Sequence, residues 1–271
     1  MTGFETVFLQ KAGATFLAAD VAFANRAAFF GDGIFETMVF AQKRIRFADA
    51  HQKRAKEGMD VLKLRQNSVS SVQQIEEYVR KNFPADVPLR IRWNIYREGI
   101  GKYTPTTSSP QETLFVQPFS PAPAIKNKAY VSESVHVCPS PWSHCKTLNG
   151  LTYVMANMER QEKGMDEVIL TDDKGFISEA GSANIFWVKN GKYYTPSLKH
   201  NAIAGVSRAM ICEILQKKGK LIQEGSYTFD DLLGAEQVFT SNVSGLSYIQ
   251  RIDEKMLSTD PIPFLEALFT W

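Results

Sequence analysis

The chain has 271 residues, and its 31 Lys and Arg against 29 Asp and Glu give a formal charge of +2. A hydrophobic content of 44% with 22% charged residues is typical of a globular protein with a sizeable core. The near-neutral charge gives no electrostatic reason to expect a nucleic-acid partner. No apolar run approaches the ~18–20 residues of a membrane helix. The first residues lack a basic start followed by an apolar run, and the three cysteines lack metal-ligand spacing, so we expect a cytoplasmic protein with reduced thiols.

The first half of the chain is expected to combine strands with two helices. Residues 34–40 are rich in aromatic and β-branched side chains and predict a strand. Two helices follow, each with apolar residues at spacings of three and four. The first is marked by Phe47, Ala55, Met59 and Leu62, and the second by Val69, Val72, Ile75, Val79 and Phe83. Asn67 and Ser68 are the candidate caps of the second helix.

Two further strands and a linker are predicted next. In residues 88–97 apolar side chains alternate with polar ones, which indicates a half-buried strand. A polar loop over 98–111 precedes a second strand at 112–118. The segment 120–127 contains two prolines and little to bury, which indicates a linker. We therefore expect an N-terminal α/β lobe over 1–119 and a C-terminal lobe over 128–271.

The second half is predicted to be strand-rich. A strand is expected at 129–138, and a helix at 149–163 is expected to turn four apolar residues inward: Leu151, Val154, Met155 and Met158. Asn190-Gly191 between two strand-like runs predicts a tight hairpin. A helix at about 206–218 follows, and Asp260-Pro261 is expected to cap a last helix. The class is α+β, with mixed, largely antiparallel sheets in two lobes.

Several common chemistries find no support in the sequence. The histidines His51, His136, His144 and His200 have no ligand spacing, so no metal site is expected. There is no GxSxG motif for a serine nucleophile. The GDG at 31–33 precedes a predicted strand rather than a helix, so it indicates a tight turn and not a dinucleotide fingerprint.

Three features together point to one chemistry. Lys146 lies in HCKTLNGL, Glu179 lies in FISEAGSANIFW, and IAGVSR (203–208) opens a helix whose free N–H groups suit a phosphate. Taken singly, they are also explained by a solvated loop lysine, a hairpin-corner carboxylate and an ordinary helix start. Pyridoxal phosphate needs all three: a lysine for its aldehyde carbon, a carboxylate that keeps its ring nitrogen protonated, and a cradle for its phosphate.

The chain resembles the class IV, or fold-type IV, pyridoxal phosphate enzymes. That family includes branched-chain aminotransferases, D-amino-acid aminotransferases and 4-amino-4-deoxychorismate lyases. The resemblance is carried, in order, by NRAAFFGDGIFET (25–37), HQKR (51–54), KTLNGL (146–151), ISEAGSANIFWVKNG (177–191), IAGVSR and FTSNVSGL (239–246). It implies a small α/β N-terminal lobe and a larger C-terminal lobe with a mixed sheet or pseudo-barrel. It also implies a cofactor between the lobes and a homodimer whose partner completes the site.

The resemblance assigns expected roles to cofactor-binding residues. Lys146 corresponds to the Schiff-base lysine, which also shuttles the substrate proton, and Glu179 to the partner of the pyridine nitrogen. Arg54, the last residue of HxxR, corresponds to a phosphate-binding arginine. The phosphate cradle is expected at Val206 and Ser207, with Asn242, the Val243 amide or Ser244 beside it. Val243 departs from the Ser or Thr that many relatives carry at its position.

Substrate recognition is expected to involve a small carboxylate- and amine-bearing molecule. Phe35 corresponds to an aromatic wall of the substrate pocket, and Lys102 lies near a loop arginine that reads a substrate carboxylate in some relatives. Arg90, Arg92 and Arg97 are further candidate cations on or beside the 88–97 strand.

Three functions remain open at this stage. Leu151 replaces a tyrosine found in branched-chain aminotransferases, and KTLN, SANIFW, YYTP (193–196) and SNVSG look closest to the lyases. The first hypothesis is therefore elimination of pyruvate from 4-amino-4-deoxychorismate, which gives 4-aminobenzoate for folate synthesis. The second is an aminotransferase acting on a small D- or L-amino acid. The third is a catalytically silent ligand-binding relative, which the presence of both Lys146 and Glu179 disfavours.

Overall fold

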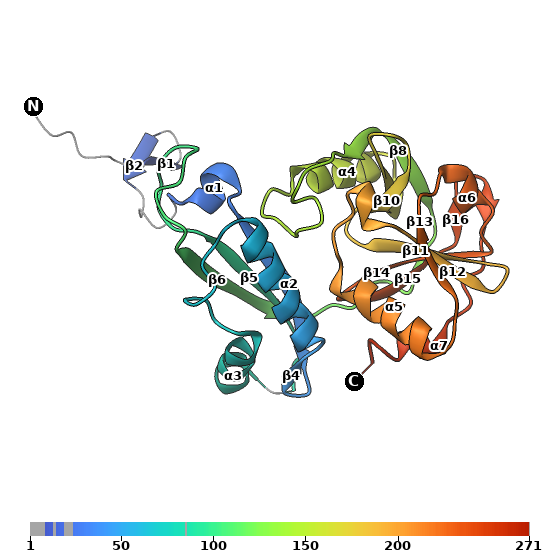
Figure 1. Ribbon diagram of the computed structural model, residues 1–271, viewed down its shortest axis with the longest axis horizontal. Coiled ribbons are helices and arrows are strands. Elements are labelled where there is room, and N and C mark those ends of the chain that lie inside the picture. The colour runs from blue at the N-terminus through green and yellow to red at the C-terminus, as the bar shows by residue number, and fades with distance from the viewer. Residues whose placement is uncertain (1–8, 13–14, 19–23, 85, 271) are drawn as a thin grey trace, which may run out of the picture.

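The computed structural model describes residues 9–12, 15–18, 24–84 and 86–270 and shows two lobes (Figure 1). The first contains a four-stranded sheet in the order β4-β3-β5-β6, with two helices packed on it. Its elements are β1 (Leu9–Ala12), β2 (Thr15–Ala18), α1 (Arg26–Phe30), β3 (Gly33–Ala41), β4 (Arg44–Ile45), α2 (Ala48–Val61), α3 (Val72–Asn82), β5 (Leu89–Arg97) and β6 (Pro110–Pro118).

The second lobe is built on two larger sheets. One has six strands in the order β13-β12-β11-β14-β15-β7, and the other has five in the order β10-β9-β8-β16-β17. The elements are β7 (Ile125–Lys126), β8 (Ala129–Val137), α4 (Leu151–Glu162), β9 (Glu167–Asp172), β10 (Ile177–Ala180), β11 (Asn184–Lys189), β12 (Lys192–Pro196), η2 (Leu198–His200), α5 (Val206–Lys217), β13 (Ile222–Gly225), α6 (Phe229–Leu233), β14 (Gln237–Asn242), β15 (Gly245–Ile249), β16 (Arg251–Ile252), β17 (Lys255–Met256) and α7 (Pro263–Glu266).

The expected fold class is confirmed. The sheets mix parallel pairs, such as β8 with β9 and β12 with β13, with antiparallel ones. Single bridges from Ala180 to Ala183 and from Gln237 to Ser258 join the two large sheets, which together curl into a half-barrel. No helix in the described part of the chain has the length and apolar character needed to span a bilayer.

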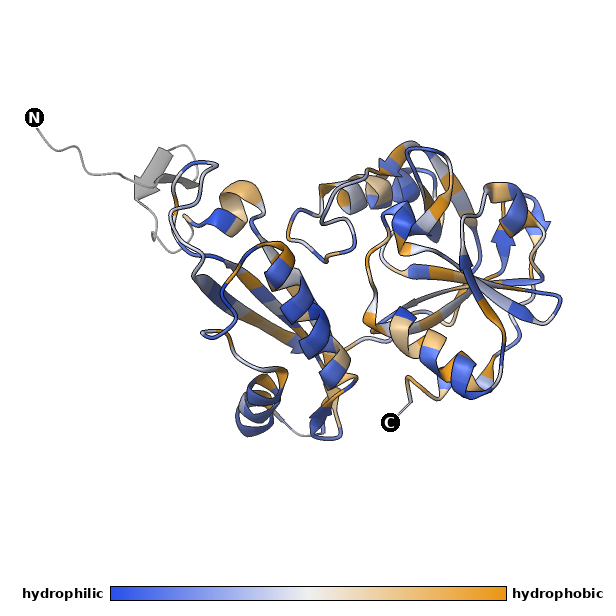
Figure 2. Ribbon diagram, in the orientation of Figure 1, coloured by the Kyte–Doolittle hydropathy of each residue, from blue (hydrophilic) through white to orange (hydrophobic). Residues whose placement is uncertain are grey.

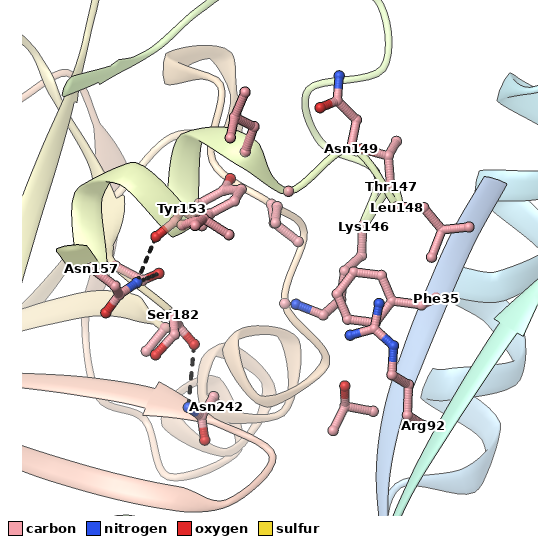
Figure 3. A pocket seen from close by; sticks show the side chains of 18 of the residues that line it. Phe35, Arg92, Lys146, Thr147, Leu148, Asn149, Tyr153, Asn157, Ser182 and Asn242 are labelled. Carbon is pink, nitrogen blue, oxygen red and sulfur yellow. Dashed lines mark hydrogen bonds between the residues drawn. The ribbon is translucent and has the colours of Figure 1, made fainter. Parts of the chain in front are cut away.

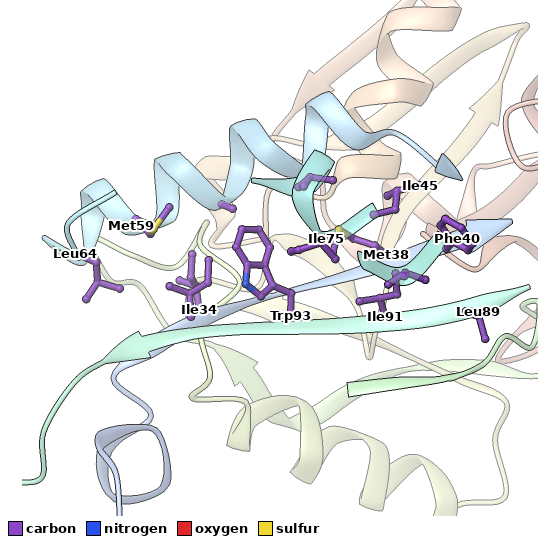
Figure 4. Close-up of a cluster of buried hydrophobic side chains, with 14 residues drawn as sticks. Ile34, Met38, Phe40, Ile45, Met59, Leu64, Ile75, Leu89, Ile91 and Trp93 are labelled. Atoms are coloured by element: carbon purple, nitrogen blue, oxygen red, sulfur yellow. The ribbon is translucent and has the colours of Figure 1, made fainter. Parts of the chain in front are cut away.

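The core of the first lobe follows the alternation seen in the sequence. Leu89, Ile91, Trp93 and Ile95 of β5 are all buried against the helices, whereas the residues between them are more exposed (Figure 4). Each fully buried side chain of this size stabilises the fold by roughly 1.5–3 kcal/mol. Hydrophilic residues run along the side of α2 that faces away from the sheet (Figure 2). The predicted amphipathic helix and half-buried strand are therefore confirmed.

Two predicted helix caps are wrong. The second helix begins at Val72 rather than after Ser68, because Ser71 and Gln74 form a reciprocal capping box that satisfies two backbone N–H groups. The last helix begins after Ile262, not Asp260, with Pro263 in its first turn. Proline is suited to that position because its missing N–H has no partner there anyway.

The inward face predicted for the helix after Lys146 is also wrong. Leu151, Val154, Met155 and Met158 of α4 are 47–64% exposed, and Ala156 is the residue that the helix buries. The opposite side of α4, with Tyr153 and Ala156, packs on β8 and β9. The apolar stripe of α4 therefore faces away from the core of its own lobe. The expected homodimer stays a prediction.

The segment between the lobes is partly built into the second lobe. Ile125 and Lys126 form β7, which pairs in parallel with β15, and the Ala122 amide donates to the Ser244 carbonyl. The predicted division at 119 and 128 stays a prediction. The hairpin predicted at Asn190-Gly191 is confirmed, with both residues at positive φ between β11 and β12.

A buried charged cluster joins β3 to α2. The Glu36 carboxylate accepts hydrogen bonds from Arg54 Nε at 2.8 Å and Arg54 Nη2 at 2.6 Å, and His51 Nδ1 lies 2.6 Å from it. Burial alone would raise the pKa of Glu36, but Arg54 and His51 reverse this and lower it to about 2. The cluster therefore favours the ionised carboxylate.

We predict that Glu36→Gln destabilises the cofactor-free protein by about 3 kcal/mol at pH 7, because Arg54 loses its buried counter-charge. The lowered pKa of Glu36 gives stability that is complete above its ordinary value near 4.5 and is lost as the pH falls toward about 2. Urea unfolding should show that the parent loses more stability than Glu36→Gln between pH 6 and pH 3. Glu77→Gln, at an exposed site on α3, should behave as the parent. Equal acid sensitivity of parent and Glu36→Gln would contradict the prediction.

Candidate active site

A cavity of about 1380 Å³ lies between the two lobes. It is larger than the roughly 300–1,000 Å³ of a pocket for one drug-sized ligand, so it has room for a cofactor and a substrate together. The cavity is lined by residues predicted from the sequence, among them Phe35, Arg54, Lys146, Glu179, Val206, Ser207, Asn242 and Val243. The structure thus brings together residues separated by more than 200 positions in the chain.

Lys146 is held by backbone pairing between the lobes. The Phe35 amide donates to the Lys146 carbonyl at 2.9 Å, and the Leu148 amide donates to the Gly33 carbonyl at 2.9 Å. Residues 146–148 therefore lie along the start of β3. A side chain at Gly33 would collide with the Ile95 carbonyl. The second glycine of GDG is therefore required because the backbone of β5 passes close to it, and not because of turn geometry. Gly31 does adopt a positive φ of 62°, at the end of α1.

The amine of Lys146 is buried and partly surrounded by other cations. Its Nζ lies 4.6 Å from the centre of the Phe35 ring, and Figure 3 shows it beside Phe35 and Arg92, with Tyr153 on the far side of the pocket. Burial, and then Arg54, lower the pKa of Lys146 to about 8, although Glu179 and Glu36 act in the opposite direction. A substantial fraction of this amine is therefore neutral and nucleophilic near pH 8.

Glu179 is a buried carboxylate on β10 that faces the same cavity. Tyr153 donates its hydroxyl to Oε1 at 2.6 Å, the Ile203 amide donates to Oε1 at 3.1 Å, and Asn184 Nδ2 lies 3.4 Å from Oε2. Burial raises the pKa of Glu179 to about 7 in spite of these donors. The site therefore disfavours an isolated charge on Glu179 and favours a charged donor beside it.

The start of α5 offers backbone donors to the cavity. The helix begins at Val206 after Gly205, with no side chain capping it, so its first N–H groups have no partner within the helix. A side chain at Gly205 would collide with Asn184 Oδ1. Ser207 Oγ lies 3.3 Å from Ser241 Oγ. These groups have the arrangement that an anionic phosphate requires.

The loop between β14 and β15 and the side chain of Arg54 lie beside that helix start. Asn242 accepts from the Ser244 amide at 2.8 Å and donates to the Ser182 carbonyl at 3.2 Å. Arg54 Nη1 donates to the Ala204 carbonyl at 3.2 Å, next to Gly205. Arg54 thus carries positive charge to the predicted phosphate cradle while Glu36 fixes its orientation.

Two predicted substrate residues lie elsewhere. The Arg97 guanidinium donates to Asp32 at 3.0 Å and to the carbonyls of Leu62, Lys63 and Thr107, and it does not line the cavity. Lys102 is exposed, and its carbonyl accepts a hydrogen bond from Arg26 at 2.6 Å. Among the described residues, Arg97 and Lys102 thus lie outside the lining of the cavity, and their expected substrate roles stay predictions.

Arg90 and Arg92 line the cavity instead of Arg97. Strand alternation explains the difference, because residues 90 and 92 share a face of β5 and residue 97 falls on the opposite face. The Arg92 guanidinium lies 3.7 Å from the centre of the Phe35 ring. Burial, and then Arg90, lower the pKa of Arg92.

Sequence reasoning missed two partners of Glu179. Asn184 faces Glu179 because the turn closed by the Ala180–Ala183 bridge places residues 179 and 184 opposite each other. Counting residues outward from this turn in the sequence would have identified Asn184. Tyr153 belongs to α4, and its contact depends on how that helix packs on the sheet. The spacing between Lys146 and Tyr153 alone carries no such signal.

Sequence comparisons place these residues in a known family. The family model described as amino-transferase class IV matches residues 33–252. A putative branched-chain-amino-acid aminotransferase of Methanocaldococcus jannaschii is 31% identical over 118 residues, 43% of this chain and 41% of the relative. An aminodeoxychorismate lyase of Vibrio harveyi is 33% identical over 106 residues, 36% of this chain and 39% of the relative. The matches thus span about two fifths of these relatives.

Solved structures share the fold across nearly the whole chain. A branched-chain aminotransferase of Thermoproteus uzoniensis has a TM-score of 0.82 at 22% identity, with 97% of this chain and 92% of that chain covered. A 4-amino-4-deoxychorismate lyase of Pseudomonas aeruginosa also has a TM-score of 0.82 at 22% identity, covering 93% and 94%. An aminotransferase of Brucella abortus bound to PLP has a TM-score of 0.79 at 22% identity, covering 96% and 97%.

The residues of the cavity fit the cofactor that this family uses. A buried lysine amine, a carboxylate whose pKa is raised by burial, and an uncapped helix start with an adjacent arginine match the aldehyde, ring nitrogen and phosphate of pyridoxal phosphate. The family match covers most of the described chain. The chain therefore belongs to the aminotransferase class IV family of pyridoxal phosphate-dependent enzymes.

Proposed function

We propose that this protein eliminates pyruvate from 4-amino-4-deoxychorismate and releases 4-aminobenzoate, a step of folate synthesis. The observation that carries the proposal is the pair of arginines, Arg90 and Arg92, on the cavity wall. Within the described residues neither forms an ion pair with an acidic side chain. Two neighbouring cations in a partly buried site favour an anionic ligand.

The proposed substrate has the charge and size that this wall suits. It carries two carboxylates on a ring, so it needs both positive charge and space. Arg92 stacked on Phe35 presents a planar guanidinium, which can receive a carboxylate through two parallel hydrogen bonds. Leu151 also lines the cavity and is apolar. Branched-chain aminotransferases have a tyrosine at the corresponding position. These features support the lyase over a branched-chain aminotransferase.

The residues around the cofactor site have separable proposed roles. Pyridoxal phosphate, when bound, supplies an electron sink for the carbon that carries the substrate amine. Lys146 would hold the cofactor through its amine and would move the proton at that carbon. Glu179 holds the proton on the ring nitrogen. Arg54 and the start of α5 bind the phosphate.

The outcome of the reaction depends on what the substrate carries next to the reacting carbon. Lys146 would take the proton from that carbon, the C–O bond to the enol ether oxygen would break, and the enolpyruvate released would take up one proton at its methylene carbon to become pyruvate. The ring gains aromaticity, and no outside oxidant is required. A substrate without such a leaving group would instead leave its amino group with the cofactor and depart as an oxo acid, with water supplying the oxo oxygen. Admission to the cavity therefore selects between the two reactions.

A second candidate is an aminotransferase acting on a small D- or L-amino acid. It is favoured by the exposed apolar side chains of α4 that line the cavity, Leu151, Val154 and Met158. Such a wall also suits an aliphatic substrate side chain. Several relatives are named as branched-chain-amino-acid aminotransferases.

We predict that cofactor-free protein binds pyridoxal phosphate faster as the pH rises through about 8, because only the neutral amine of Lys146 attacks the aldehyde. Stopped-flow absorbance between pH 6.5 and 9.5 measures this rate. Borohydride reduction should then label the peptide that contains Lys146. Lys53→Arg, at an exposed position on α2, should leave both results unchanged. A rate independent of pH, or a label on another lysine, would contradict the assignment.

We predict that Arg92→Leu raises KM for 4-amino-4-deoxychorismate about tenfold or more, since a charge-assisted contact contributes roughly 1.5–3 kcal/mol. Affinity for pyridoxal phosphate should stay within about twofold, because Arg92 lies beside Phe35 and away from the phosphate cradle. Arg80→Leu, at an exposed site on α3, is the control for loss of an arginine. An unchanged KM would remove Arg92 from substrate binding.

We predict that the cofactor-loaded protein releases pyruvate and 4-aminobenzoate in equal amounts from 4-amino-4-deoxychorismate. Transamination of alanine or branched-chain amino acids should be slow. Coupled lactate dehydrogenase detection of pyruvate, with chromatography for 4-aminobenzoate, measures both products. Rapid transamination of a common amino acid without any 4-aminobenzoate would support the second candidate and exclude the first.

A further inference from the structure

We propose that Tyr153 is a positioning residue that fixes the Glu179 carboxylate, so that Oε1 is engaged by the protein and Oε2 is presented to the ring nitrogen of the cofactor. The inference rests on the proposed role of Glu179. It assigns a function to a side chain that lies seven residues after Lys146 and faces the same cavity (Figure 3).

The two oxygens of Glu179 have different surroundings. Oε1 accepts two hydrogen bonds, from the Tyr153 hydroxyl at 2.6 Å and from the Ile203 amide at 3.1 Å. Among the described residues, the one donor near Oε2 is Asn184 Nδ2, at the long distance of 3.4 Å, and that amide group also donates to the Ile203 carbonyl at 2.9 Å. A carboxylate oxygen accepts two hydrogen bonds readily. Oε2 is therefore the oxygen with acceptor capacity left for a donor in the cavity.

The position of Tyr153 is itself fixed by the fold. Asn157, one turn later in α4, donates to the Tyr153 carbonyl at 2.8 Å and to the Gly181 carbonyl at 2.9 Å. Gly181 belongs to the turn between β10 and β11, directly after the strand that carries Glu179. This bond sets the distance between the helix and the hairpin, and so it aligns the Tyr153 hydroxyl with Glu179.

Charged and titratable groups reach Glu179 from three elements. They are Tyr153 from α4, Lys146 from the loop before α4, and Arg208 from α5. Burial raises the pKa of Tyr153, so its hydroxyl remains a hydrogen-bond donor throughout the working pH range. A donor to the carboxylate stabilises the ionised form. Tyr153 therefore lowers the basicity of Glu179 as well as fixing its direction.

Removal of the Tyr153 hydroxyl should make Glu179 more basic. A more basic carboxylate holds a proton shared with the cofactor ring nitrogen more tightly, so that proton should be released at higher pH. The strength of a hydrogen bond to a charged group corresponds to a shift of roughly one to two pH units. A structural role alone would lower stability without moving this titration.

The test is a pH titration of the visible absorbance of the protein loaded with pyridoxal phosphate. Tyr153→Phe removes only the hydroxyl, and Tyr153→Gln restores a side-chain donor. Tyr248→Phe is the matched control, because Tyr248 also donates its hydroxyl to a glutamate, Glu266 at 3.1 Å, outside the cavity. Glu179→Gln reports whether the titration depends on Glu179 at all. Thermal unfolding and separate kcat and KM values are recorded for each variant.

We expect Tyr153→Phe to move the midpoint upward by about one pH unit or more and to lower kcat more than it raises KM. Tyr153→Gln should lie between Tyr153→Phe and the parent, and Tyr248→Phe should lower thermal stability with an unchanged midpoint. If Glu179→Gln alters the titration and Tyr153→Phe does not, the role of Tyr153 is refuted while the proposed function stands. If Glu179→Gln leaves the titration unaltered, the cofactor role of Glu179 and this inference both fail.

Discussion

The geometry of the cavity depends on one buried carboxylate. Strand β3 alternates its side chains, so Phe35 faces the cavity and Glu36 faces α2 behind it. An isolated charge at Glu36 would be strongly unfavourable, and its burial is possible because Arg54 and His51 from α2 supply donors. The same bonds hold Arg54 so that it reaches the Ala204 carbonyl in the other lobe. The hydrogen bonds that stabilise the Glu36 carboxylate in the first lobe therefore also hold the Arg54 guanidinium at the predicted phosphate cradle of the second lobe.

The lobes meet through backbone groups as well as through side chains. Residues 146–148 pair with the start of β3, which ties the lysine loop to the strand that carries Phe35. At the opposite end of the interface, Arg46 donates to the Val243 carbonyl at 3.2 Å and to the Phe269 carbonyl at 2.6 Å. Arg46 thereby links the first lobe to the loop beside the predicted phosphate cradle and to Phe269.

Local sequence patterns are sufficient to predict those features of the structure that depend on residues close together in the chain. Nearby residues are enough to predict the alternation in β5, the Asn190-Gly191 hairpin and the glycine before α5. The family resemblance, added to these patterns, predicts that Lys146, Glu179 and the start of α5 lie in one cavity. Pattern failed where a partner is distant. The apolar stripe of α4 predicts a face of the helix but not the surface that this face meets. The sequence around Arg97 does not show its acceptors, because Asp32 and the Leu62 carbonyl lie 65 and 35 positions away.

The cavity combines groups whose charged forms the fold disfavours. Burial lowers the pKa of Lys146 to about 8 and raises that of Glu179 to about 7, while Arg92 adds positive charge and forms no ion pair with an acidic side chain among the described residues. We propose that pyridoxal phosphate binds with its protonated ring nitrogen at Glu179 and its carbonyl carbon at Lys146, which would stabilise the ionised form of Glu179 and use the neutral amine of Lys146. Such a ligand binds the folded chain and not the unfolded one, so it also stabilises the fold by mass action. We propose that Arg90 and Arg92 then bind an anionic substrate, because neither forms an ion pair with an acidic side chain among the described residues.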